Sequence, residues 1–347
     1  MASHDPVRVG VIGLGAWGKN LLRQFYRGPD SVVPIACDMD PAARARAQAQ
    51  YPDLHVTDNP DDVLKADVQG VVIATPPESH FKLATEAIDA GKDVFVEKPL
   101  VLDIGESKRL VQHADKAGRI VMVGHIMMFH PAVDWLKDYV AKDGLGPVYY
   151  LYATRTNLGR VREIENAMWS FAPHDISMMS YILGEKPRRV AAVGQSYLRS
   201  GIEDVVFVTL WYDGDRMAHI HTSWLDPHKV RALTIVGQRQ MAVFSDTTPQ
   251  QRITIFDKGV DRAMDYNTYA EYLTLRTGEA HIPSIPSTEP LAIECQHFVD
   301  RMRDRGTPRS DGRNGIEVLQ VLAAAQASLE SGGIPVDIPP LGEEQIP

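Results

Sequence analysis

A glycine-rich turn lies directly between a short apolar strand and the start of a helix. The segment Gly13-Leu14-Gly15-Ala16-Trp17-Gly18 follows the predicted strand Val7 to Ile12. Gly13 allows the tight turn, Gly15 lets the backbone approach a pyrophosphate, and Gly18 lets the helix pack closely on the strand. The glycines alone also fit a flexible turn, but the strand and helix around them favour the dinucleotide-binding unit of a Rossmann domain.

An acidic residue after the second predicted strand, Val32 to Cys37, indicates which dinucleotide binds. Asp38 lies about 20 residues after Gly18, the spacing at which a carboxylate hydrogen-bonds the ribose hydroxyls of NAD. Asp40 lies beside it and the nearest arginine is Arg44, so a 2′-phosphate would be repelled rather than clamped. The alternative role of Asp38 is a helix cap, although Asp40 already supplies one. We therefore expect NAD(H) rather than NADP(H).

Short β-rich runs alternate with helical patterns from Val7 to Gly124, which is typical of βαβ units that build a doubly wound parallel sheet. Loops at the carboxyl ends of such strands line the ligand crevice. Two of these loops follow the predicted strands Val68 to Ala74 and Asp93 to Val96. Further strands are expected at Ile120 to Val123 and near His55. The residues that we expect to contact the cofactor there are Thr75, Pro76, Pro77, His80, Glu97 and Lys98.

Past Pro131 the pattern changes to the period-two alternation of antiparallel strands, and Asp213-Gly214 indicates a tight hairpin turn. The predicted strands are Pro147 to Thr156, Arg189 to Ser196, Val205 to Tyr212, Arg216 to Trp224, Val230 to Val236 and Arg252 to Phe256. The predicted helices are Ala132 to Tyr139, Pro290 to Asp304 and Gly315 to Leu329. We therefore expect a Rossmann domain over residues 1–126 and an α+β domain with a large antiparallel sheet over residues 127–347.

The net charge and the cysteine content limit the partners and the cellular compartment that we expect for this protein. The 347 residues include 36 basic and 45 acidic ones, and the net charge of -9 argues against a nucleic-acid partner or an anionic membrane surface. Cys37 and Cys295 lie far apart without a CxxC spacing, so neither a disulfide nor a thiolate zinc site is indicated. No apolar run approaches the ~20 residues of a membrane span. We expect a soluble, cytoplasmic protein that binds small molecules.

Several motifs together resemble the glucose-fructose oxidoreductase, inositol dehydrogenase and rhizopine-catabolism (Gfo/Idh/MocA) family over nearly the whole chain. The matching residues of the first half are Gly13 to Gly18, Asp38, Ala74-Thr75-Pro76-Pro77 with His80, Ala90-Gly91-Lys92 and Glu97-Lys98-Pro99. In the second half, Trp169 to Asp175 and Asp311 to Gly315 look like a branch that acts on nucleotide-linked sugars. The resemblance implies that Lys98 and His174 form a catalytic pair. It also implies an open-faced antiparallel sheet used for homo-oligomer contacts, in a dimer or a tetramer.

The implied pair suits the oxidation of a secondary alcohol by NAD. This reaction requires a base for the hydroxyl proton while a hydride moves to the nicotinamide, and a histidine with a pKa near ~6.5 suits that base. Lys98 can hydrogen-bond the same hydroxyl and stabilise the developing alkoxide. Without the resemblance, Lys98 could be a solvated charge and His174 a helix cap. Many family members carry an aspartate four residues before the histidine; Ser170 stands there in this chain, which puts a substrate-positioning carboxylate in doubt.

Three arginines stand close together in the segment Arg155-Thr156-Asn157-Leu158-Gly159-Arg160-Val161-Arg162. Such a cluster can clamp an anionic substrate, and a sugar-linked diphosphate is the natural candidate. Surface ion pairing with Glu163 and Glu165 is an equally good interpretation. The candidate substrate-binding residues are therefore Lys98, Arg155, Asn157, Arg160, Ser170 and His174.

Two further features have structural explanations. His219 and His221 share one strand face, but no further ligand is placed by the sequence to complete a metal shell, so we expect sheet-lining residues and no metal. Trp169 either stacks on the nicotinamide or fills core space.

The expected function is NAD-dependent oxidation of a secondary hydroxyl of a sugar to a ketone. The resemblance implies C3 of a UDP-linked N-acetylhexosamine or a related pyranose. Alternative substrates are an aminoglycoside, a free sugar or an inositol, and another option is a glycoside-cleaving enzyme that regenerates its own NAD. A regulator that binds NAD without chemistry is an alternative of another class, against which the presence of both Lys98 and His174 speaks.

Overall fold

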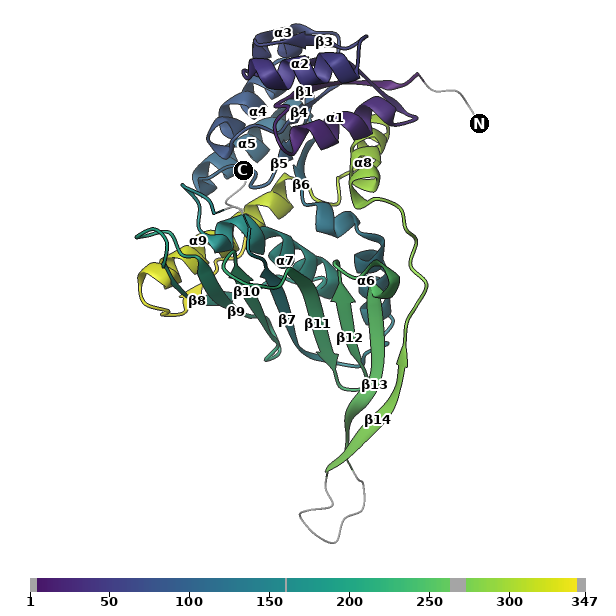
Figure 1. Cartoon of the computed structure of the whole chain (residues 1–347), viewed down its shortest axis with the longest axis vertical. Helices are drawn as coiled ribbons and strands as arrows, with labels where there is room; N and C mark the ends of the chain where they lie inside the picture. Colours follow the sequence, from purple (N-terminus) through teal and green to yellow (C-terminus); the bar gives the residue numbers. More distant parts are fainter. Residues whose placement is uncertain (1–4, 160, 263–272, 342–347) are drawn as a thin grey trace. The chain divides into compact units, whose positions relative to one another are not determined.

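The computed structural model describes residues 5–159, 161–262 and 273–341, and it divides into two compact units (Figure 1). The first unit comprises the residues up to 129 together with 288–319 and Leu341, and the second comprises 130–287 and 320–340. The expected division at residues 126 and 127 lies near the first of these boundaries. Residues 288–319 differ from the expectation, because they belong with the Rossmann unit rather than with the second domain.

The first unit is built on a six-stranded sheet with the order β3-β2-β1-β4-β5-β6, in which all neighbouring strands are parallel. This order confirms the doubly wound Rossmann topology, with its switch point between β1 and β4. The strands are β1 Val7–Ile12, β2 Ser31–Cys37, β3 His55–Thr57, β4 Gly70–Ile73, β5 Asp93–Glu97 and β6 Val121–Gly124. The connecting helices are α1 Gly18–Arg27, α2 Pro41–Gln50, α3 Pro60–Lys65, α4 His80–Asp89 and α5 Ile104–Ala117.

The returning helix α8, Pro290–Asp304, completes the core of this unit. Its Phe298 packs edge-on against Phe25 of α1 and Phe95 of β5, with ring centroids 6.3 and 5.8 Å apart, and all three side chains are fully buried. Burying one such ring stabilises a fold by roughly 2 kcal/mol. The aromatic face of α8 therefore explains why residues far along the chain rejoin the Rossmann sheet. Helix α9, Gly312–Glu330, follows and is capped by Asp311, whose side chain accepts from the Asn314 amide at 2.8 Å.

The second unit holds a nine-stranded sheet with the order β14-β13-β12-β11-β7-β10-β9-β8-β15. All neighbours are antiparallel except β7 and β10, which are parallel, so the expected antiparallel sheet is a mixed one. The strands are β7 Val148–Thr156, β8 Arg189–Gln195, β9 Val205–Trp211, β10 Met217–Ser223, β11 Val230–Gly237, β12 Met241–Ser245, β13 Ile253–Arg262, β14 Leu273–His281 and β15 Val336–Asp337. The expected hairpin between β9 and β10 is confirmed, with Gly214 in the left-handed conformation at φ 67°.

The two faces of this sheet differ in composition. On β7, Leu151, Ala153 and Arg155 are buried, whereas the alternating Tyr150 and Tyr152 are exposed. Two helices, α6 Pro131–Ala141 and α7 Ala167–Leu183, belong to the same unit, and α7 packs on β7, β9 and β10. The sheet is thus covered on one face and open on the other. In the described part of the chain, no helix is long and apolar enough to cross a membrane.

Candidate active site

The glycine-rich turn has the geometry that a dinucleotide requires. Gly13 adopts a φ of 97°, and a Cβ there would lie 2.6 Å from the backbone of Ala74, the residue after β4. A Cβ on Gly18 would lie 1.9 Å from the Gly13 carbonyl oxygen, so only glycine allows α1 to start this close to β1. A Cβ on Gly15 would meet no atom within 4 Å, and the N-terminus of α1 has no side-chain cap. The turn therefore offers a pyrophosphate an open backbone at Gly15 and a helix N-terminus that has no side-chain cap.

Asp38 bonds the backbone of this turn. Its Oδ2 accepts from the Leu14 amide at 2.6 Å, and its Oδ1 accepts from the Asp40 amide at 2.8 Å. Asp40 caps α2 by accepting from the Ala42 amide at 2.9 Å, so the capping role belongs to Asp40 and not to Asp38. The Arg44 guanidinium donates to the backbone carbonyls of Asp38 and Met39. These contacts leave the Asp38 carboxylate beside the glycine-rich turn and direct the Arg44 guanidinium to backbone carbonyls.

The loop after β4 is held by a buried histidine. His80 is fully buried, and its two ring nitrogens lie 2.9 Å from the carbonyl oxygens of Thr75 and Pro99. Burial lowers the pKa of His80, although both carbonyl contacts act in the opposite direction. Its position favours support of the two loops over the expected contact with the cofactor. Thr75, Pro76 and Pro77 remain at the carboxyl edge, where the Thr75 hydroxyl contacts that of Ser79 at 2.7 Å.

Lys98 follows the carboxyl end of β5 and lies close enough to His125 to affect its charge. The register pairs Glu97 with Gly124 of β6, so Lys98 and His125 follow from neighbouring strand ends. His125 is buried, its Nδ1 lies 2.8 Å from Oδ1 of Asn314, and burial lowers its pKa to about 4. Sequence reasoning missed His125 and Asn314. Their signal was available, because His125 follows a predicted strand at the ligand edge and Asn314 lies in the Asp311 to Gly315 motif.

Glu97 joins this strand end to the glycine-rich turn. Trp17 Nε1 donates to its Oε1 at 2.5 Å, and the Lys98 amide contacts its Oε2 at 3.2 Å. A Cβ on Gly124 would lie 2.8 Å from the same carboxylate, so glycine leaves the space that Glu97 fills. Burial raises the pKa of Glu97 to about 7, against the opposing effects of Trp17 and Lys98.

His174 lies in the middle of α7 and is partly exposed. The cap of this helix is Asn166, whose side chain accepts from the Trp169 amide at 3.1 Å, so the capping role for His174 is excluded. Ser170 is buried and donates to Glu165 at 2.8 Å. Trp169 donates from its indole to Gln326 at 3.1 Å, which ties it to α9.

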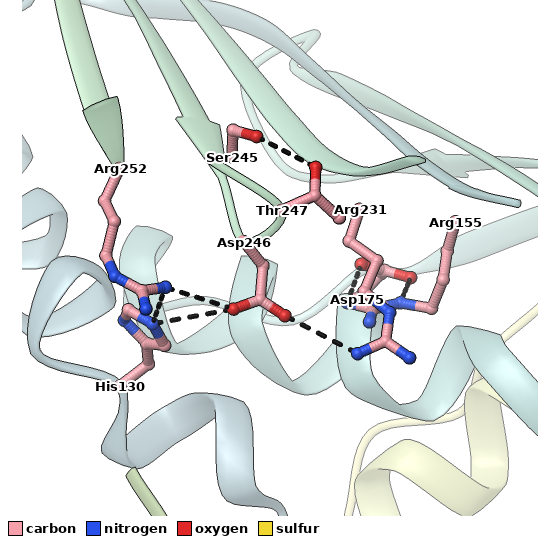
Figure 2. A network of polar contacts seen from close by, with 8 residues as sticks. All are labelled: His130, Arg155, Asp175, Arg231, Ser245, Asp246, Thr247 and Arg252. Atoms are coloured by element: carbon pink, nitrogen blue, oxygen red, sulfur yellow. Dashed lines mark hydrogen bonds and ion pairs between the residues drawn. The ribbon is translucent and has the colours of Figure 1, made fainter. Parts of the chain in front are cut away.

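The expected arginine clamp takes a different form. Arg155 is buried and donates from Nε and Nη2 to the two carboxylate oxygens of Asp175, at 2.8 and 2.9 Å (Figure 2). Arg162 pairs with Glu165 at 3.4 Å, which agrees with the ion-pair interpretation. Arg160 lies outside the described residues. The Asn157 amide donates to the Ser223 carbonyl at 3.1 Å, which fixes the start of the segment.

A row of charged side chains continues from Arg155 along the helix-covered face (Figure 2). Arg231 of β11 is paired with Arg155 in the register. Asp246 comes directly after β12, and its amide donates to the Arg231 carbonyl. Asp246 lies 3.6 Å from Arg231 and 3.3 Å from Arg252. His130 contacts Asp246 at 3.7 Å, and burial lowers its pKa to about 4. With this histidine neutral, three guanidinium groups face two carboxylates.

The two histidines of β10 belong to the open face. His219 and His221 both stack on Phe207 of β9, with ring centroids 6.0 and 4.5 Å apart. This arrangement agrees with sheet-lining residues. Within the described ranges, no three histidine, cysteine, aspartate or glutamate residues gather as a metal site would need.

Both units match known protein families. Residues 7–125 match the model of an oxidoreductase family with an NAD-binding Rossmann fold, and residues 133–243 match the GFO/IDH/MocA C-terminal domain. The chain is 26% identical to the UDP-N-acetylglucosamine 3-dehydrogenase of Acidithiobacillus ferrooxidans over 340 residues, 93% of this chain and 99% of that relative. It is also 26% identical to the scyllo-inositol 2-dehydrogenase (NAD(+)) of Bacillus subtilis over 356 residues, 96% of this chain and 97% of that relative. A solved oxidoreductase structure from Magnetospirillum magnetotacticum superposes with a TM-score of 0.78 at 27% identity, covering 92% of this chain and 99% of that one.

Proposed function

Because this chain belongs to the Gfo/Idh/MocA family of NAD-dependent oxidoreductases, we propose that it oxidises a secondary hydroxyl of a sugar to a ketone. The observation that carries the proposal is the link between the glycine-rich turn and the strand that presents Lys98. Trp17 of the turn bonds Glu97, and Glu97 contacts the amide of Lys98. The lysine is therefore held beside the backbone that would bind the dinucleotide.

The residues present fit NAD. The backbone at Gly15 and the N-terminus of α1 would hold the pyrophosphate, and Asp38 would accept from the ribose hydroxyls. The nicotinamide of NAD+ supplies the hydride acceptor when the cofactor is bound. His174 takes the proton of the substrate hydroxyl as general base, and Lys98 donates a hydrogen bond to the same oxygen and stabilises the alkoxide. Both residues act on one carbinol in this proposal.

The substrate that we propose is a UDP-linked N-acetylhexosamine or related pyranose, oxidised at C3. The full-length likeness to a UDP-N-acetylglucosamine 3-dehydrogenase supports it, but an inositol dehydrogenase is equally similar. The charged row favours an anionic substrate over a neutral or cationic one. Arg231 makes no hydrogen bond through its guanidinium within the described chain, and its side chain is 42% exposed. It can therefore donate to a phosphate.

A substrate panel tests this function. UDP-sugars, free sugars, inositols and aminoglycosides are supplied with NAD+, and NADH absorbance is followed. We expect the highest kcat/KM with a UDP-N-acetylhexosamine. Oxidation of inositols alone would identify the protein as an inositol dehydrogenase. NAD binding without turnover of any substrate would favour a regulator that binds NAD without chemistry.

The same assay tests the two catalytic roles. Lys98→Ala and His174→Ala should each lower kcat at least ~100-fold while NAD affinity is kept, which is the contribution of a general acid or base. Lys82→Ala and His113→Ala replace residues in exposed ion pairs with Glu86 and Asp89 and serve as controls. Full turnover by His174→Ala would show that His174 is not the general base.

We also propose that the open face of the nine-stranded sheet binds a second copy of this chain. Tyr150, Tyr152, Phe207 and Met217 are at least 39% exposed, and the pairing register places them on one face. A contiguous apolar surface of this kind marks an interaction site. Tyr152→Asp should shift the protein toward the monomer in analytical ultracentrifugation. A monomer mass for both the wild type and the variant would contradict the proposal.

A further inference from the structure

The turn of α7 that carries His174 lacks part of the usual helical restraint. Pro173 lies inside the helix, directly before His174. A proline has no amide hydrogen, so the backbone bond that this residue would make to the carbonyl four positions earlier cannot form, and its ring pushes the preceding turn away. The backbone alone therefore fixes the direction of the His174 side chain less firmly than in an unbroken helix.

The residue after His174 supplies a different restraint. Asp175 accepts two hydrogen bonds from Arg155, and the side chains are only 2% and 7% exposed (Figure 2). A bidentate pair of this kind fixes both the distance and the rotation of the two groups. Burying both charges also carries a desolvation cost that leaves such pairs close to neutral for stability. The pair is better suited to fix an orientation than to stabilise the fold.

The other end of the restraint is rigid. Arg155 lies on β7 in the interior of the sheet, where the register pairs it with Thr222 on one side and Arg231 on the other. Asp246 lies close enough to stabilise the charge of Arg155, and it is itself held between Arg231 and Arg252. A movement of α7 at Asp175 would therefore have to break a bond to a fixed strand.

We propose that Arg155 and Asp175 are positioning residues, which hold the turn after Pro173 so that the His174 imidazole points at the substrate hydroxyl. This inference rests on the proposed function, in which His174 is the base. It assigns Arg155 to the orientation of the base, in place of the expected contact with the substrate.

The test separates orientation from stability by removing both charges together. The single variants Arg155→Met and Asp175→Asn each leave a buried unpaired charge and should lower both the urea midpoint and kcat. The double variant has no unpaired charge and should recover most of the urea midpoint. We expect its kcat to stay at least ~10-fold low with NAD affinity unchanged, because small displacements of a catalytic group slow the reaction by this order. A double variant that recovers both midpoint and kcat would overturn the inference.

Two further measurements keep this outcome distinct from a failure of the proposed function. If His174→Ala retains turnover, the base assignment fails, and the positioning inference fails with it.

The NMR resonance of the His174 ring, identified by its loss in His174→Ala, reports on the imidazole without any substrate. We expect it to shift or broaden in the double variant, and an unchanged resonance would count against the inference. The exposed pair of Arg189 and Asp337, 2.6 Å apart, gives the matched control Arg189→Met with Asp337→Asn, which should leave kcat and the resonance unchanged.

Discussion

Trp17 donates from its indole nitrogen to a carboxylate oxygen of Glu97 over 2.5 Å, and this contact connects residues that are far apart in the sequence. Trp17 belongs to the glycine-rich turn, and Glu97 ends the strand that presents Lys98. The contact therefore sets the spacing between the glycine-rich turn and the lysine. Gly124 on the neighbouring strand completes it by leaving room for the carboxylate.

The first prediction concerns the protonation of Glu97. Burial raises its pKa from 4.5 to about 7, so the unfolded chain ionises at lower pH than the folded protein. The stability contributed by the protonated form is therefore present below pH 4.5 and is lost as the pH rises through about 7. Glu97→Gln has no group that ionises here. The difference between its free energy of unfolding and that of the wild type should therefore increase by up to about 3 kcal/mol, in favour of the variant, as the pH rises from 4.5 to 8. Urea unfolding across this range measures it. The exposed Glu78→Gln is the control, and a constant difference between Glu97→Gln and the wild type would contradict the prediction.

A second prediction concerns cofactor choice. Asp38→Asn keeps a hydrogen-bond acceptor for the Leu14 amide but removes the charge that would face the ribose hydroxyls in the proposed complex. NADH should bind the variant roughly 10-fold more weakly, since hydrogen bonds to a charged group contribute about 1.5–3 kcal/mol. NADPH should lose less affinity or gain some, because repulsion of the 2′-phosphate is reduced. Fluorescence titration with both cofactors measures the ratio, and an equal loss for both would refute the role of Asp38.

A third prediction separates substrate classes. Arg231→Ala should raise KM for a UDP-sugar by roughly 10-fold or more, because a charge-assisted hydrogen bond to phosphate is lost. The KM of a neutral sugar should stay the same. Arg188→Ala is a matched control, since this arginine is also exposed and also lies 3.6 Å from a single aspartate, Asp213. Equal changes for charged and neutral substrates would show that Arg231 does not contact the anion.

A fourth prediction concerns a buried carboxyl group on α8. Glu294 is fully buried, neither of its carboxylate oxygens has a hydrogen-bond partner in the described structure, and burial raises its pKa well above the ordinary value. Glu294→Met has a similar shape without the polar atoms and should increase the free energy of unfolding by about 1–3 kcal/mol at pH 8. The neighbouring Gln296→Met removes hydrogen bonds to Asp30 and Asp300 and should not stabilise. Urea midpoints compare them, and a destabilised Glu294→Met would show that the carboxyl has a partner.

Local signals in the sequence were sufficient for the Rossmann half of the molecule. The glycines at 13 and 18 have the conformation and close backbone contacts that their spacing predicts, and Asp40 caps the helix that follows it. These features depend on backbone conformation and on neighbours within a few residues, so the local sequence is enough to predict them. The hairpin at Gly214 was predictable for the same reason.

Three other features needed the tertiary structure. Phe298 returns α8 to the first sheet, the parallel pairing of β7 with β10 makes the second sheet mixed, and Arg155 binds Asp175 instead of an exposed anion. In each case the partner lies far along the chain. The sequence does not distinguish an arginine that faces solvent from one that faces a buried carboxylate. For Arg155, the packing of α7 on the sheet decides, because it brings Asp175 to the guanidinium.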